Sequence, residues 1–158
     1  MTETSSPFAE RASKDAVEKG TTFAPKFDAD GLIPCITVDA DSGAVLMFAH
    51  MSRETLAETI EIGEAVYWSR SRAERWHKGA TSGSVQKLVE MRTDCDQDVI
   101  LVRVHVEGSG ASCHLGYRSC FFRAVPVGTA PTPATELTVV EDGPLFDPDV
   151  VYGNKDKS

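Results

Sequence analysis

The sequence contains no long hydrophobic run, and none of its apolar stretches approaches the roughly 20 residues that a membrane-spanning helix needs. Its first residues, MTETSSPFAERASKDAVEKG, are polar and lack the apolar segment of a secretory signal. We therefore expect a cytoplasmic protein with no membrane partner.

Positive charge is also scarce, with 16 Lys and Arg against 24 Asp and Glu and a formal net charge of −8. The phosphate backbone of a nucleic acid would be repelled by such a protein, except at a concentrated basic patch. We therefore expect a small-molecule ligand and no nucleic-acid partner.

Cysteine is limited to 4 residues in 158. In a cytoplasmic chain such thiols are metal ligands, reactive groups or buried hydrophobes more often than disulfides. There is no C-x-x-C pair, so the spacing alone is a weak zinc signal. The P-C-x-x-C motif of zinc nucleobase deaminases is missing too, which argues against that class of enzyme.

Length and a hydrophobic fraction of 41% are enough for one compact domain, which we place at residues 28–127. Residues 1–27 are polar with scattered apolar positions and predict a flexible or partly helical lead-in. Residues 128–158 are rich in Pro, Thr and Asp and predict a loosely packed tail.

Turn and cap residues divide the domain into short elements. Two apolar runs joined by Asp39 to Gly43 predict a β-hairpin. Ser52 is placed to cap a helix running through Ile60, with Leu56 and Ile60 on its apolar face and Gly63 as its end.

Alternating or continuous apolar stretches predict further strands in EAVYWSRS, SVQKLVEMRTD, DVILVRVHVEG and at the end of GSGASCHLGYRSCFFRAVPV. The resulting fold class is α+β, a mainly antiparallel sheet with few helices.

Cationic side chains gather in WSRSRAERWHKGATSG, which we expect to be a loop after a strand. Arg70, Arg72, Arg75 and Lys78 lie there with His77. A basic loop with Gly and Ser in an acidic protein is suited to hold a phosphorylated small molecule. The alternative is a solvated loop whose arginines pair with surface acids.

The stretch TDCDQD places three carboxylates and a thiol together between two predicted strands. If it is extended, Asp94, Asp96 and Asp98 share one face and Cys95 points to the other. Their mutual repulsion predicts a bound hard cation. An EF-hand is excluded because Val99 stands where that loop needs Gly. A solvated acidic turn remains the alternative.

The remaining cysteines lie in different surroundings. Cys35 lies in the apolar run GLIPCITV and is expected to pack as a small hydrophobe. Cys95, Cys113 and Cys120 could converge on zinc, within one chain or between two, leaving the fourth tetrahedral position open. His114 is either a fourth ligand of a closed structural site or a general base beside the metal.

Four motifs in order, GEAVYWSRSR, W-H-K-G-x-T-S-G, D-C-D-x-D and C-H-x-G-x-R-S-C-F-F, resemble the phosphoribosyl-AMP cyclohydrolase family of histidine biosynthesis over residues 31–124. The resemblance implies a hydrolase that uses zinc and magnesium to open the adenine ring of 1-(5-phosphoribosyl)-AMP between N1 and C6.

The resemblance also implies roles for individual residues. Zinc would be held by Cys95 of one subunit and by Cys113 and Cys120 of the other in an intertwined homodimer, and magnesium by Asp94, Asp96 and Asp98. His114 is our candidate for proton transfer. Our candidate contacts to the substrate are Arg70, Arg72, Trp76, His77, Lys78, Thr81, Ser82 and Arg118. The competing hypothesis is a non-enzymatic dimer with structural zinc.

Overall fold

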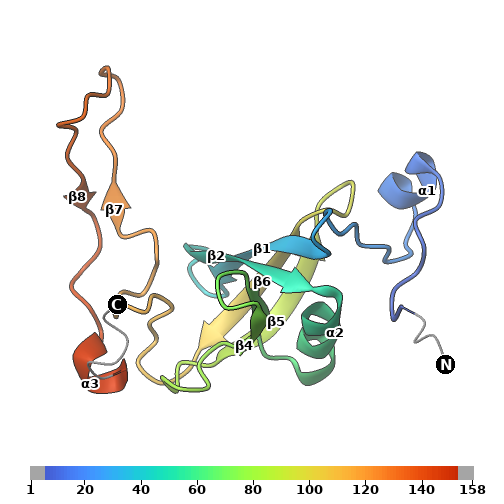
Figure 1. Cartoon of the computed structure of the whole chain (residues 1–158), viewed down its shortest axis with the longest axis horizontal. Coiled ribbons are helices and arrows are strands. Elements are labelled where there is room, and N and C mark those ends of the chain that lie inside the picture. Colours follow the sequence, from blue (N-terminus) through green and yellow to red (C-terminus); the bar gives the residue numbers. More distant parts are fainter. Residues whose placement is uncertain (1–5, 153–158) are drawn as a thin grey trace.

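The computed structural model describes residues 6–152; residues 1–5 and 153–158, at the ends of the predicted lead-in and tail, lie outside the described part (Figure 1). Its elements follow one another as α1 (Lys14–Lys19), β1 (Leu32–Asp39), β2 (Val45–Ser52), α2 (Arg53–Ile62), β3 (Val66–Ser69), β4 (Glu74–His77), β5 (Gln86–Thr93), β6 (Ile100–Val106), β7 (Arg123–Ala124), β8 (Thr138–Val139) and α3 (Pro148–Tyr152). Within residues 6–152, no helix is long and apolar enough to cross a membrane.

Six strands form one sheet in the order β4-β3-β2-β1-β6-β5, and every neighbouring pair is antiparallel except β1 and β6, which run parallel. The sheet curls until β5 approaches the chain before β3, where the Leu88 amide donates to the Gly63 carbonyl at 2.9 Å. The predicted α+β class with a mainly antiparallel sheet and few helices is confirmed.

The predicted hairpin joins β1 to β2. The Asp39 carboxylate accepts hydrogen bonds from the amides of Asp41, at 3.1 Å, and Ser42, at 2.7 Å, which closes the turn. Gly43 has a φ of 75°, a conformation that glycine adopts without strain. The turn chemistry read from the sequence therefore matches the structure.

The core lies inside the curled sheet and under α2. Ile33, Leu46, Leu56 and Ile100 are almost completely buried there. Each such side chain contributes about 1.5–3 kcal/mol through its removal from water. Cys35 is completely buried beside them, and burial raises the pKa of its thiol to about 12, so this cysteine is a small core residue as expected.

Helix α2 begins and ends where the sequence predicts. Ser52 and Thr55 form a capping box at its start, and Gly63 ends it in the left-handed conformation. The predicted apolar face is wrong in one position, because Ile60 is exposed. Thr59 is buried instead, and its hydroxyl accepts the Val66 amide at 3.0 Å, so a satisfied polar group occupies the face against β3.

The predicted basic loop is only partly a loop. Residues 74–77 form strand β4, which pairs antiparallel with β3 so that Trp76 lies opposite Tyr67. The two rings are 5.5 Å apart, and this aromatic contact favours a strand over an irregular segment. Only residues 70–73 and 78–85 therefore connect strands.

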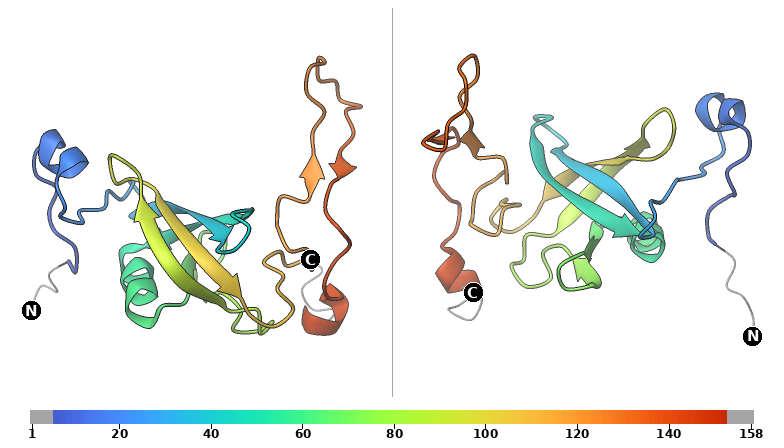
Figure 2. Two further views of the ribbon diagram at one scale, coloured as in Figure 1. Left: turned by 180° about the vertical axis from the view of Figure 1, so that it is seen from behind. Right: turned by 45° about the horizontal axis from the view of Figure 1, so that its top comes forward.

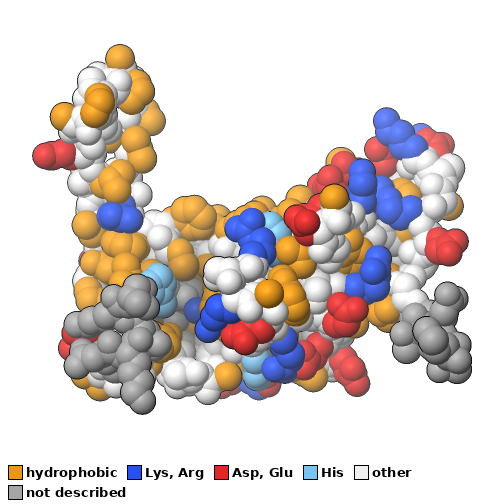
Figure 3. All heavy atoms as spheres, viewed as in Figure 1, with side chains coloured by type: hydrophobic (Ala, Val, Ile, Leu, Met, Phe, Trp, Pro, Cys, Tyr) orange, Lys and Arg blue, Asp and Glu red, His pale blue; other side chains and the backbone are white. Residues whose placement is uncertain are grey.

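Two extensions flank the sheet (Figures 1 and 2). The lead-in carries α1 on one side, and its residues Phe8, Phe23 and Phe27 pack against the core. The tail leaves on the other side as the projecting β7–β8 hairpin and then α3. Hydrophobic side chains line the projecting hairpin (Figure 3), among them exposed Val127 and Val140.

Candidate functional site

The connection between β5 and β6 is an acidic loop, residues 94–98. Asp94, Asp96 and Asp98 each offer a carboxylate oxygen, and these three oxygens lie within 4.8 Å of one another. The segment is a turn and not the extended strand considered above, because Asp94 Oδ1 accepts the amides of Asp98, at 2.9 Å, and Val99, at 3.0 Å. The turn brings the carboxylates together more closely than alternation along a strand would.

Crowding of the carboxylates perturbs their proton affinity. Hydrogen bonds to Asp94 and Asp96 raise the pKa of Asp98 to about 6. Burial acts to raise the pKa of Asp94, but hydrogen bonds from Asp98 and Asp96 and from backbone amides outweigh it and lower the pKa. Carboxylate oxygens clustered in this way are suited to a hard divalent cation such as Mg²⁺.

A second cluster lies in the thiol loop, residues 112–120. The loop is closed by the Cys113 amide, which donates to the Tyr117 carbonyl at 3.1 Å. The Cys120 amide donates to the Leu46 carbonyl at 2.7 Å and ties the loop to β2. The thiols of Cys113 and Cys120 lie close enough to change each other's pKa, so the two potential zinc ligands adjoin.

Each of the two thiols changes the proton affinity of the other. The hydrogen bond from Cys120 lowers the pKa of Cys113 to about 6, against the effect of burial, and the same contact raises the pKa of Cys120. The Leu115 amide also donates to Cys113 Sγ, at 3.4 Å. The lowered pKa favours the thiolate of Cys113, and the thiolate is the form that ligates metals.

Cys95 lies in the acidic loop and is exposed. Among residues 6–152, the only group of three ligand atoms close enough to hold one ion is the aspartate cluster. The described part of a single chain therefore does not bring Cys95 together with Cys113 and Cys120. Of the two arrangements left open by the sequence, convergence within one chain is not seen among the described residues, and convergence between two chains stays a prediction.

Two buried polar side chains hold the start of the thiol loop. Lys78 Nζ donates to the Ser112 carbonyl at 2.6 Å, and Gln86 Nε2 donates to the Ser112 hydroxyl at 3.0 Å. Gln86 Oε1 in turn accepts from the Tyr67 hydroxyl at 2.6 Å. Sequence reasoning missed Gln86 and Ser112, because a polar residue in a strand pattern gives no sign that its partner lies far along the chain.

Burial lowers the pKa of Lys78, while the nearby thiols Cys120 and Cys113 act to raise it. The ammonium also lies 5.0 Å from the centre of the Trp76 ring. Lys78 is therefore positioned as a cation beside the thiol pair.

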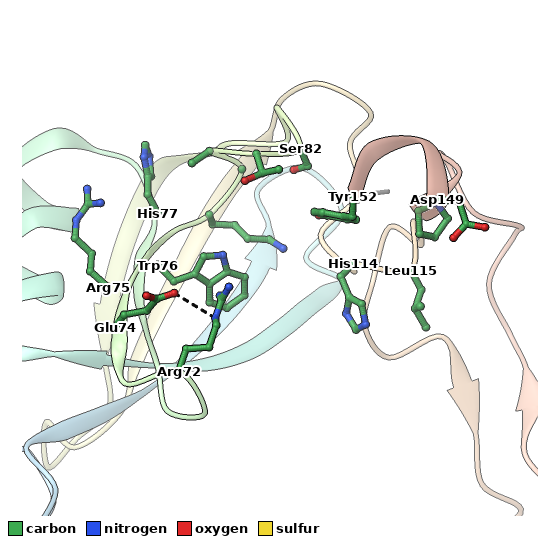
Figure 4. Close-up of a pocket in the computed structure, with 15 residues that line it drawn as sticks. Arg72, Glu74, Arg75, Trp76, His77, Ser82, His114, Leu115, Asp149 and Tyr152 are labelled. Carbon is green, nitrogen blue, oxygen red and sulfur yellow. Dashed lines mark ion pairs between the residues drawn. The ribbon is translucent and has the colours of Figure 1, made fainter. Parts of the chain in front are cut away.

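A cleft of about 1040 Å³ opens beside the thiol loop. Figure 4 shows it between one wall formed by Trp76 of β4 and by Arg72 of the preceding turn, and the opposite wall formed by His114, Leu115 and α3. Six of the eight substrate candidates line it, namely Arg72, Trp76, His77, Lys78, Thr81 and Ser82. Sequence reasoning missed the α3 residues Asp149 and Tyr152, which lie in the tail outside every motif.

Arg70 and Arg118 do not line this cleft. Both are exposed, and Arg118 lies near enough to Asp39 to contribute to the low pKa of that carboxyl, after the larger effect of the Ser42 amide. Their proposed contacts to substrate stay predictions.

The cationic side chains of the β4 region are paired with acids. Arg75 makes a 2.6 Å ion pair with Glu58, and Arg72 lies 3.5 Å from Glu74. His77 Nε2 is 2.9 Å from Glu64. The alternative in which arginines of this segment pair with surface acids therefore holds for Arg72 and Arg75, while the binding of a phosphorylated molecule stays a prediction.

Sequence comparisons identify the class of protein. The phosphoribosyl-AMP cyclohydrolase family matches residues 47–122. The chain is 52% identical to the phosphoribosyl-AMP cyclohydrolase of Rhodopseudomonas palustris strain HaA2 over 88% of this chain and 92% of that protein. It is 51% identical to the enzyme of Bradyrhizobium diazoefficiens over 89% and 97% of the two chains, and 56% identical to that of Brucella suis over 74% and 84%.

Similarity to these relatives shows that the chain is an enzyme. Its curled sheet carries the thiol pair and the cationic cleft described above. The chain belongs to the phosphoribosyl-AMP cyclohydrolase family.

Proposed function

We propose that this protein is cytoplasmic and that it hydrolyses 1-(5-phosphoribosyl)-AMP at the bond between N1 and C6, a step of histidine biosynthesis. The observation that carries the proposal is similarity at about half of all positions to curated cyclohydrolases over nearly their whole length. The cleft beside the thiol loop supports it, because its lining combines an aromatic ring with cations and hydroxyls that suit a base and phosphates.

Zinc is proposed to bind Cys113 and Cys120 of one subunit and Cys95 of a second copy. Cys113 and Cys120 lie together and would supply two ligands. Cys95 is exposed and lies apart from this pair within one described chain, so it is available to a second copy. Exposed apolar residues on the projecting β7–β8 hairpin offer a surface for the second copy, consistent with an intertwined homodimer.

Magnesium is proposed to bind the acidic loop through Asp94, Asp96 and Asp98. The close approach of the three carboxylates supports this, since a divalent cation relieves their repulsion. Together with the cations of the cleft it would neutralise the two phosphorylated riboses of the substrate.

The chain's own residues then have distinct roles. Zinc, when bound, supplies a water with a pKa lowered toward neutrality. Ribosylation at N1 makes the C6 amidine electrophilic, so hydrolysis would add a water oxygen at C6 and break the N1–C6 bond. His114 faces the cleft beside Cys113, and we assign it the transfer of the proton from water to N1. The oxygen stays on C6 as a carboxamide, and N1 leaves as the formimino nitrogen.

Substrate binding falls to the other residues of the cleft. Trp76 is placed to stack on the base, and Arg72, His77, Thr81 and Ser82 to bind phosphate and ribose oxygens. Lys78 also lines the cleft, but its ammonium donates a hydrogen bond to the Ser112 carbonyl, so we assign it the support of the cleft wall and not a direct bond to the substrate.

The test is the ultraviolet absorbance of the purified protein mixed with 1-(5-phosphoribosyl)-AMP, since ring opening changes the chromophore. We expect a spectral change that a zinc chelator abolishes and added zinc restores. The Cys113→Ser variant should lose zinc and turnover together. No spectral change with zinc and magnesium present would contradict the proposal and favour the non-enzymatic zinc dimer.

A further inference from the structure

We propose that Gln97 is a positioning residue for the divalent-cation site and that the lead-in is part of that site's support. This inference rests on the proposed cation site at Asp94, Asp96 and Asp98. Gln97 lies within that cluster in sequence, yet its side chain points away from solvent and is only 6% exposed.

Every polar group of Gln97 has a partner. Its Oε1 accepts the Ala24 amide at 2.8 Å, and its Nε2 donates to the carbonyls of Val17, at 3.0 Å, and Thr22, at 3.2 Å. Its own carbonyl accepts the Lys26 amide at 2.7 Å. Four hydrogen bonds therefore join one residue of the acidic loop to the lead-in.

The fifth hydrogen bond lies within the loop. The Gln97 amide donates to the Asp94 carbonyl at 3.1 Å, and the residue has a φ of 57°, which is uncommon for a side chain of this size. Such a conformation persists where its surroundings fix it. Here the lead-in supplies those surroundings, and the turn that results carries Asp96 and Asp98, the sequence neighbours of the anchored residue, whose carboxylate oxygens lie within 4.8 Å of each other.

The lead-in is itself anchored, so it can hold the loop. Phe8, Phe23 and Phe27 pack on the core, and the Arg11 guanidinium donates to the Ala24 carbonyl at 2.9 Å. A cavity of about 370 Å³ between lead-in and loop is lined by Arg11, Lys14 and Asp96 among others. The loop is therefore fixed from the core through the lead-in.

The role is tested with two variants of the full-length chain. Gln97→Gly removes the backbone strain of the left-handed conformation, because glycine adopts it freely, and it also removes the three side-chain hydrogen bonds. Gln97→Glu keeps an acceptor for the Ala24 amide and loses the two donated bonds. Thr59→Val is the matched control, because it removes buried hydrogen bonds on α2 that no contact links to the acidic loop.

The measurement is binding of Mn²⁺, by electron paramagnetic resonance, to zinc-loaded protein. We expect both Gln97 variants to weaken Mn²⁺ binding by about 10- to 100-fold, the range seen when residues that support metal ligands are changed, because the loop that carries the carboxylates loses its side-chain bonds to the lead-in. Zinc content should not change. Amide hydrogen exchange at Ala24 and Lys26 should become faster in Gln97→Gly and stay as in the wild type in Thr59→Val.

Unchanged Mn²⁺ affinity in Gln97→Gly, or an equal loss in Thr59→Val, would overturn the positioning role. The Asp96→Asn variant separates this failure from that of the proposed function. If Asp96→Asn loses Mn²⁺ while the Gln97 variants keep it, the cation site stands and only the positioning role falls. If the wild type binds no Mn²⁺, both fall.

Discussion

The ammonium of Lys78 donates a 2.6 Å hydrogen bond to the carbonyl of Ser112, the residue directly before Cys113. A buried cation thus holds the backbone at the point where the thiol loop begins. The sequence predicts that this lysine binds a phosphate, so its replacement would be expected to weaken substrate binding alone. Because its observed partner is the Ser112 carbonyl, we expect its replacement to destabilise the fold.

Replacing Lys78 with Met should destabilise the fold. The Ser112 carbonyl would lose a partner in a buried setting, which costs about 1–3 kcal/mol. Urea unfolding measures the change. Lys87→Met is the matched control, because Lys87 is half exposed and its ion pair with Glu64 is worth about 0–1 kcal/mol. Equal effects of the two substitutions would contradict a structural role for Lys78.

Removing the Cys120 thiol should change the acidity of Cys113. The hydrogen bond from Cys120 is the largest cause of its low pKa, so Cys120→Ala should raise that pKa above about 6 in metal-free protein. Cys120→Ser keeps a donor and should leave the pKa closer to its wild-type position. The pH dependence of thiolate ultraviolet absorbance measures both, and identical titrations of the two variants would contradict this effect of Cys120 on Cys113.

Magnesium should stabilise the protein more at pH 7.5 than at pH 5. The pKa of Asp98 in the folded chain is raised to about 6, so folding favours the protonated form and the metal-free protein loses stability as pH rises toward and through 6. A divalent cation replaces that proton. The increase in melting temperature on adding Mg²⁺ should therefore be small at pH 5 and large at pH 7.5, and Asp98→Asn should reduce the difference.

Arg72→Ala should weaken substrate binding. Arg72 lines the cleft, and a hydrogen bond to a charged phosphate contributes about 1.5–3 kcal/mol, so we expect KM to rise roughly tenfold or more with little change in kcat. Arg92→Ala removes an exposed arginine of β5 that does not line the cleft and serves as the control. A KM that stays constant in both variants would remove Arg72 from the substrate site.

Local chemistry made much of the fold predictable. The turn at Asp39 and the cap at Ser52 each depend on residues within a few positions, and both lie where the sequence indicates. The same holds for the acidic cluster, whose carboxylates are neighbours in the chain.

Contacts between distant segments were not predictable in this way. Strand β4 is favoured by the contact of its Trp76 with the Tyr67 ring of β3. The parallel pairing of β1 with β6 cannot be read from the residue pattern of either strand. Gln97 reads as one more polar residue in an acidic turn, although its partners Val17 and Ala24 lie far back along the chain. Such residues are recognised only when the folded chain shows what they contact.

The pairing of Cys35 with Ile100 at the middle of the sheet has a consequence for the order of events during folding. The centre of the sheet joins strands that are far apart in the sequence, so its pairing closes a long loop at a cost in chain entropy that a local hairpin does not have. The acidic loop leads directly into β6, and the thiol loop follows it. On a ribosome, neither proposed metal site can therefore assemble before the second half of the chain has emerged.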